Sequence, residues 1–140
     1  MTKLYNKHMH TMNVIPFRLS PGQDMKEEMD GLAKELDLQA ACVLTCVGSL
    51  TTAVLRFANQ PRAATLTGHF EIVSLTGTLS IHGSHYHISI SDEEGRTYGA
   101  HLMEGCKIYT TAEIVIGVLE GVQFLREMDS LSGYPELYVK

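Results

Sequence analysis

The sequence predicts an α+β domain whose main feature is a large, mainly antiparallel β-sheet of about seven strands flanked by helices. Apolar residues recur at helical spacing in one early segment, between Asp24 and Leu36. A succession of short segments rich in Val, Ile and Thr, separated by glycine-containing turns, fills the rest of the chain. With 140 residues, of which 44% are apolar, the chain is expected to form a single domain, 1–140, with its own core.

The N-terminal part is predicted as an arm, a strand and a helix. Residues 1–12 are expected to be a flexible arm, and 13–19 a strand that ends at the Pro21-Gly22 turn. Asp24 has the character of a helix N-cap, with Glu27 three residues later as in a capping box. The apolar positions that follow at helical spacing are Met25, Met29, Leu32, Ala33 and Leu36.

The remaining segments are predicted as strands. They cover residues 41–47, 50–57, 67–74, 75–82, 84–91, 97–103, 108–117 and 122–127. Gly48-Ser49 is interpreted as a turn between the first two. Gly68 and Gly77 are interpreted as bulges or points of close backbone approach.

Composition limits the class of protein. No apolar run approaches the ~20 residues that span a bilayer, and the N-terminus lacks the apolar core of a signal peptide, so no membrane partner and a cytoplasmic location are expected. The chain has three cysteines, which form no metal-binding or disulfide pattern. Because the net charge is −5 and no basic cluster is present, direct nucleic-acid binding has weak support.

One segment carries the pattern of a functional site. In 84–91, polar and apolar residues alternate strictly, and side chains two apart on a strand share a face. His85 and His87 therefore point to one face, together with Ser89 and Ser91, while Tyr86 and its alternates point to the core.

The following turn determines which residues meet these histidines. A three-residue loop, Glu93-Glu94-Gly95, places the glycine where a bulge needs positive φ, and it sets His87 directly across from His101. A two-residue loop would place His101 on the apolar face instead. The first register is favoured because of Gly95, and it brings His85, His87 and His101 together.

Three convergent imidazoles suit a divalent metal. Zn²⁺ is the first choice, with a water molecule in the open fourth position, but imidazole also binds Fe, Ni, Cu and Mn. Glu71 and Glu104 are candidates for an additional ligand or supporting group. Arg56 is a candidate for binding an anionic substrate, or alternatively for a surface ion pair. His-x-His on a half-exposed strand also occurs without any metal, and His69 and His82 are either supporting groups or ordinary surface histidines.

The sequence resembles the PPC domain, the plants-and-prokaryotes conserved domain, along nearly its whole length. The matching stretches, in order, are 18–24, 48–50, 68–77, 83–92 and 98–102. The resemblance implies a seven-stranded antiparallel sheet flanked by helices, a homotrimer, and a fold related to acetolactate decarboxylase, a zinc lyase whose metal is held by histidines. Carried over to this chain, the family's histidine positions are His85, His87 and His101. One departure is Ala100, where the family has glycine.

Prokaryotic members of this family are often called DNA-binding proteins, by association with the plant members. The plant members carry AT-hook motifs, which bind DNA, and a short sequence box that contacts transcription factors. This sequence contains no hook, and His69 and Val73 replace two residues of the box.

Two functions are therefore expected from the sequence. The first is a metal-binding homotrimer that acts as a regulatory or interaction module. The alternative is a zinc-dependent lyase or hydrolase acting on a small carboxylate-bearing substrate. A protein partner or a small-molecule ligand fits one or the other.

Overall fold

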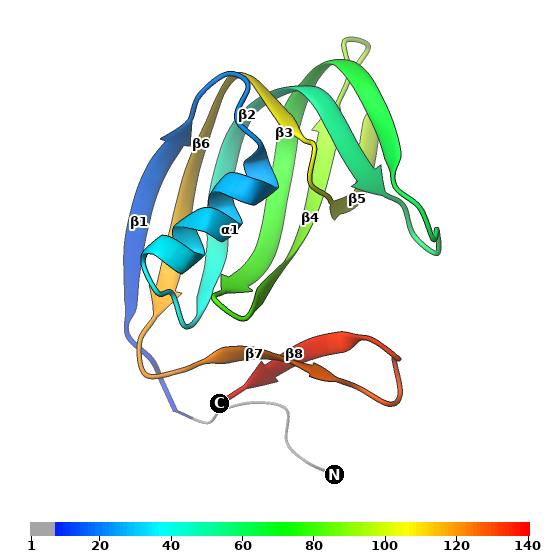
Figure 1. The fold of residues 1–140 in the computed structure, drawn as a ribbon. Helices are drawn as coiled ribbons and strands as arrows, with labels where there is room; N and C mark the ends of the chain where they lie inside the picture. The colour runs from blue at the N-terminus through cyan, green and yellow to red at the C-terminus, as the bar shows by residue number, and fades with distance from the viewer. Residues whose placement is uncertain (1–7) are drawn as a thin grey trace.

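The computed structural model describes residues 8–140 (Figure 1). Along the chain the elements are β1 (Met12–Leu19), α1 (Met25–Glu35), β2 (Ala41–Arg56), β3 (Ala64–Ser80), β4 (Gly83–Ser91), β5 (Thr97–Leu102), β6 (Lys107–Leu119), β7 (Phe124–Met128) and β8 (Pro135–Val139). A six-stranded antiparallel sheet has the order β1-β6-β2-β3-β4-β5, and β7 and β8 form a separate hairpin. The predicted α+β class with a mainly antiparallel sheet is confirmed. Within residues 8–140, a single helix flanks the sheet.

Helix α1 begins where the sequence predicts it. The Asp24 carboxylate accepts hydrogen bonds from the backbone N–H groups of Lys26 and Glu27, which caps the first turn. Met25, Met29 and Ala33 are fully buried and lie on the face that packs against the sheet. Since they recur every four residues, one side of α1 covers the core while its charged side remains in solvent.

Two predicted strand breaks are wrong. Gly48-Ser49 lies inside the continuous strand β2, and the predicted strands 67–74 and 75–82 form one strand, β3. Gly48 allows close contact with β6 rather than a turn, since a Cβ there would lie 2.1 Å from the carbonyl oxygen of Thr111. Gly77 has the same role beside β4, where a Cβ would lie 2.3 Å from the carbonyl oxygen of His85. The glycines were correctly marked as special positions, but Gly48 was assigned the wrong function.

The C-terminal end of β2 closes part of the sheet on itself. At this end β2 pairs with β3 on one side and with β5 on the other, so the path β2-β3-β4-β5 returns to its start. The closing pairs are Leu55 with Leu102, which are both buried in the core, and Arg56 with His101. Alternation along the strands therefore places Arg56 and His101 together on the outer face.

The chain ends in a hairpin that the sequence showed only in part. β7 overlaps the predicted strand 122–127, whereas β8 was not predicted. The hairpin is attached to the main sheet by hydrogen bonds from the Phe124 N–H to the Gln39 carbonyl oxygen, at 2.9 Å, and from the Ser80 hydroxyl to the Phe124 carbonyl oxygen, at 2.7 Å. In Figure 1 this orange and red hairpin lies below the end of the sheet where β3 turns into β4.

The expected N-terminal arm, 1–12, is described only in part. Residues 1–7 lie outside the described residues, and Met12 already belongs to β1. His10 is attached to the sheet edge, because its Nδ1 donates to the Glu120 carbonyl oxygen at 2.9 Å. No helical segment among the described residues combines the length and apolar character needed to cross a bilayer.

Candidate metal centre

The β4–β5 turn has the predicted three-residue form. The N–H of Gly95 donates to the Asp92 carbonyl oxygen, and the N–H of Asp92 donates to the Arg96 carbonyl oxygen, both at 2.9 Å. Gly95 has a φ of 79°, a left-handed conformation that favours glycine. A hydrogen bond from the Arg96 guanidinium, at 2.7 Å, holds the pKa of Asp92 below its usual value. This turn fixes the predicted register, in which His87 pairs with His101.

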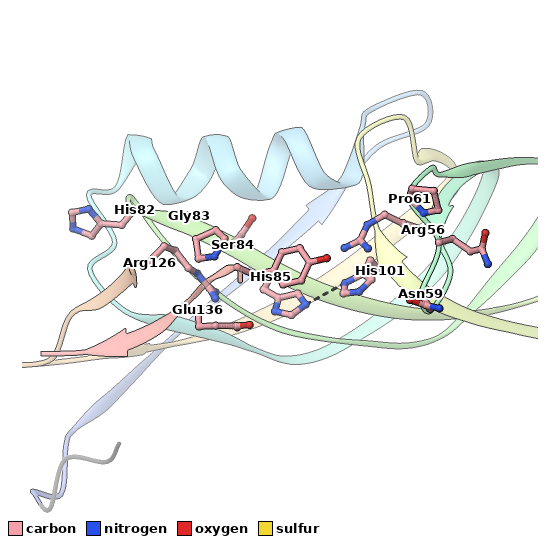
Figure 2. A pocket seen from close by; sticks show the side chains of 13 residues that line it. Arg56, Asn59, Pro61, His82, Gly83, Ser84, His85, His101, Arg126 and Glu136 are labelled. Carbon is pink, nitrogen blue, oxygen red and sulfur yellow. Dashed lines mark hydrogen bonds between the residues drawn. The ribbon is translucent and has the colours of Figure 1, made fainter. Parts of the chain in front are cut away.

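The predicted histidines converge on one point. The Nε2 atoms of His85 and His87 are 3.2 Å apart, and His101 Nδ1 lies 3.2 Å from the first and 3.1 Å from the second. His85 and His87 are exposed, His101 is half-buried, and Figure 2 shows the approach of His85 to His101 as a dashed line. Tyr86, between the two histidines of β4, is 2% exposed and points into the core as expected.

Hydrogen bonds cannot satisfy this triangle of nitrogens. Each ring nitrogen is either a donor with one proton or an acceptor with one lone pair. With one donor among the three atoms, two acceptors still face each other, and with two donors, two N–H groups face each other. A cation at the centre removes the conflict because all three lone pairs then point at it.

The spacing also fits a small transition-metal ion. Tetrahedral Zn²⁺, with metal–nitrogen bonds of about 2.0–2.1 Å, places its ligand nitrogens roughly 3.3–3.4 Å apart. The observed 3.1–3.2 Å is slightly shorter, which three imidazoles on one side of an ion accommodate by narrowing their angles. Burial, followed by the charges of neighbouring groups, lowers the pKa of His85 and of His101, which favours the neutral imidazoles that bind metals.

The three imidazoles lie beside a large open cavity. It has a volume of ≈ 840 Å³, and its wall includes His85, His101, Arg56, Arg126 and Glu136. In Figure 2 the two histidine rings lie between Arg126 on one side and Arg56 on the other. A fourth ligand position on the cavity side would therefore face charged side chains that a small molecule can reach.

The structure places the other sequence candidates as follows. Arg56 lines the cavity beside His101, and His82 lines it as well. Glu71 lines a different pocket, beside Ser49 and Thr110, and Glu104 is exposed in the β5–β6 connection. His69 also lies elsewhere, and its Nδ1 contacts the Glu93 carboxylate at 3.2 Å. In the part of the chain that the structure describes, the residues that could share one metal ion are His85, His87 and His101.

Sequence reasoning missed Arg126 and Glu136. Both lie in the C-terminal hairpin, and they reach the cavity only because that hairpin folds back over the turn between β3 and β4. Neither residue belongs to a motif, and no local pattern connects them with the histidines.

Ala100, the one departure from the family pattern, packs against the core on the side of β5 opposite His101, so its methyl group leaves the imidazole cluster unobstructed.

Two curated proteins match nearly all of this chain in sequence, and both are much longer than it. Two proteins called Bifunctional protein GlmU, from Synechococcus strains JA-3-3Ab and JA-2-3B'a(2-13), are 45% and 44% identical to this chain over 130 residues. The match covers 93% of this chain but 21% of each of those proteins, so this chain spans about a fifth of their length.

Solved structures share the fold over most of its length. A hypothetical protein from Salmonella enterica is 40% identical, with a TM-score of 0.93 and coverage of 95% of this chain and 96% of the other. A metal-containing protein from Archaeoglobus fulgidus is 23% identical, with a TM-score of 0.77 and coverage of 89% and 92%. A Bacteroides thetaiotaomicron protein to which DNA binding has been ascribed is 16% identical, with a TM-score of 0.77 and coverage of 95% and 98%.

The family follows from the sequence match. Residues 6–120 match the Plants and Prokaryotes Conserved (PCC) domain, and this span includes β1 to β6 and all three clustered histidines. The chain is therefore a member of the Plants and Prokaryotes Conserved domain family.

Proposed function

We propose that this protein is a cytoplasmic, homotrimeric, metal-binding module with a regulatory or interaction role, and that His85, His87 and His101 hold a divalent metal, in the first place Zn²⁺. The mutual approach of three imidazole nitrogens to 3.1–3.2 Å carries the metal site. The module role is supported by the longer proteins, in which the matching region forms 21% of the chain.

Elemental analysis of protein purified without an affinity tag tests the metal site. Wild-type protein, stripped and then reconstituted with Zn²⁺, is expected to retain one metal ion per chain after dialysis. The variant His85→Ala/His87→Ala/His101→Ala is expected to retain none, because it has lost every imidazole of the cluster. His69→Ala is the matched control, since it removes an exposed imidazole that contacts Glu93 instead. Equal zinc content in the triple variant and wild type would contradict the site.

The proposed homotrimer is supported by exposed apolar side chains on the middle strands. Leu44 and Val47 on β2 are 47% and 57% exposed, and Val73 on β3 is 57% exposed. Association with copies of the same chain would remove this apolar surface from water. Analytical ultracentrifugation is expected to show three chains per particle, and a monomer at all concentrations would rule the assembly out.

The alternative function is a zinc-dependent lyase or hydrolase acting on a small carboxylate-bearing substrate. The cavity of ≈ 840 Å³ beside His85 and His101, with Arg56 and Arg126 in its wall, favours this reading. A bound divalent metal with an open position supplies polarisation of a carbonyl group or activation of water. Here the imidazoles would orient the metal, and the arginines would orient the substrate.

His87→Ala separates the two functions. An enzyme is expected to lose turnover of its substrate while the fold, measured by circular dichroism, is retained. A module without catalytic activity is expected to show no turnover in wild type on small 2-oxo and 2-hydroxy carboxylates, while metal content still falls in the variant.

Direct DNA binding remains the least supported function. Its electrostatic part requires several Lys or Arg side chains on phosphates, and this chain has a net charge of −5. A gel shift with random duplex at low salt tests it, and a salt-dependent shift by the wild-type protein would restore DNA binding as a function.

A further inference from the structure

Within residues 8–140, two arginines in the cavity wall form no ion pair with a carboxylate. Arg56, at the end of β2, and Arg126, in β7, are both half-buried. The ion pairs within 4.0 Å among residues 8–140 all involve other cations. Arg126 Nη2 donates one hydrogen bond, to the Thr78 hydroxyl at 2.9 Å, while a guanidinium carries five N–H donors. Both side chains therefore retain donors in the cavity wall.

The sheet register places these arginines on opposite sides of the histidine cluster. Arg56 is the cross-strand partner of His101. Thr78, which holds Arg126, is the cross-strand partner of His85. The two arginine side chains consequently flank the rings of His85 and His101, as Figure 2 shows.

The charges in the cavity favour an anion. Its wall contains two guanidinium groups and one carboxylate, that of Glu136, although the whole chain has a net charge of −5. Burial lowers the pKa of Arg126, because its positive charge is partly desolvated, and the nearby Glu136 carboxylate offsets this only in part. A desolvated charge that is only partly balanced is unfavourable, and a bound anion would compensate it.

We propose that Arg56 and Arg126 form a two-point clamp for a small anion that carries two carboxylate groups or a phosphate group, bound over the histidine cluster. The inference rests on the proposed metal site for one further contact, at the open coordination position. The cavity volume of ≈ 840 Å³ falls within the range of about 300–1,000 Å³ that is typical of small-molecule sites.

The clamp depends on the C-terminal hairpin. Arg126 lies beyond residues 6–120, the part of the chain that matches the family domain, and the hairpin carries it to the cavity wall opposite Arg56. Anion binding would thus depend on the last two strands together with the main sheet.

Isothermal titration calorimetry with malonate and with inorganic phosphate tests the clamp, using zinc-loaded and zinc-free protein at constant ionic strength. At least one of the two anions is expected to bind, and which one binds distinguishes a dicarboxylate site from a phosphate site. Arg126→Gln and Arg56→Gln are each expected to weaken binding by about 10- to 100-fold, since each removes one charged hydrogen-bonding group. Acetate, which carries one carboxylate group instead of two, is expected to bind more weakly than malonate.

Arg18→Gln is the matched control. Arg18 lies on β1, at the opposite edge of the sheet from β5, where it hydrogen-bonds to Thr111. Replacing Arg18 by Gln removes the same charge as the other two substitutions. Anion affinity is expected to stay at the wild-type value in this variant. An equal loss in Arg18→Gln and Arg126→Gln would show only a general charge effect and would overturn the clamp.

The two proposals fail in distinguishable ways. If zinc does not bind but malonate or phosphate still binds and depends on both arginines, the clamp stands and the metal site falls. If zinc binds and neither anion does, or if Arg126→Gln binds as well as wild type, the clamp is wrong while the metal site stands. Elemental analysis of each arginine variant is expected to show wild-type zinc content.

Discussion

Neighbouring residues on β4 have opposite roles. Tyr86 is 2% exposed, and its hydroxyl donates to the Asp30 carboxylate on α1 at 3.0 Å, so it joins the helix to the sheet. Burial, with the Asp30 charge next to it, raises the pKa of Tyr86, and the phenol remains protonated. His87, one residue later, points to the opposite face, where its Nε2 contacts the other two imidazoles.

Tyr86→Phe and His87→Ala are therefore expected to separate stability from metal binding. Tyr86→Phe should lower the free energy of unfolding by about 1–3 kcal/mol, because it leaves the partly buried Asp30 carboxylate without this hydrogen bond. Zinc content should stay at the wild-type level. His87→Ala should lower the zinc content. In metal-free protein it should change the free energy of unfolding by no more than about 0.5 kcal/mol, since its side chain is exposed. Urea unfolding and elemental analysis measure both, and a metal loss in Tyr86→Phe would contradict this division.

At the scale of elements, the turn of the β4–β5 hairpin fixes how its two strands pair. The Asp92 carboxylate accepts from the N–H groups of Glu94 and Arg96, both at 2.9 Å, which holds the loop in its three-residue form. Gly95 supplies the left-handed conformation. The turn thereby sets the pairing of His87 with His101, so the proposed metal site depends on a loop at the other end of the hairpin.

Gly95→Ala is expected to lower the free energy of unfolding by about 1–2 kcal/mol, the usual penalty for a left-handed residue with a Cβ. Steric clash should contribute nothing, because an added Cβ would meet no atom within 4 Å. Gly95→Asn is the control, and it should lose less because Asn tolerates this conformation. Urea unfolding of both variants measures the difference, and equal losses would mean that φ at this position is not the cause.

For the whole molecule, the proposed metal site lies on the β4–β5 hairpin, and β5 connects that hairpin to a strand far away in the sequence. His85 and His87 lie on β4 and His101 on β5, while β5 is itself joined to the end of β2. A metal bound by the folded chain alone adds stability through linkage. Zinc at 100 times its dissociation constant is expected to raise the free energy of unfolding of metal-free wild type by about 2.7 kcal/mol.

Thermal unfolding with and without zinc measures this gain as a rise in Tm. A chelator should reverse the rise, and His85→Ala/His87→Ala/His101→Ala should show none, whereas His69→Ala should respond as wild type does. A rise of the same size in the triple variant would place the bound zinc elsewhere in the molecule.

Local patterns were sufficient to predict the three histidines of the candidate site, but not the charged side chains around them. Alternation along 84–91 separated His85 and His87 from Tyr86, and the glycine in the turn selected the register that brings His101 to them. The same kind of local signal located α1 through Asp24 and the buried positions that follow it. Local signals failed at Gly48, because a glycine that permits close contact with β6 looks the same in sequence as a glycine that makes a turn.

The sequence by itself thus determined the fold class, the helix and the three convergent histidines, since each follows from periodicity along single segments and from the residues of the caps and turns between them. Only the tertiary structure decided which charged groups surround them. Arg56 meets His101 through the closure of β2 on β5, and Arg126 arrives from a hairpin that binds Thr78, 48 residues away in sequence. Such contacts depend on how whole strands and hairpins pack, which no local periodicity records.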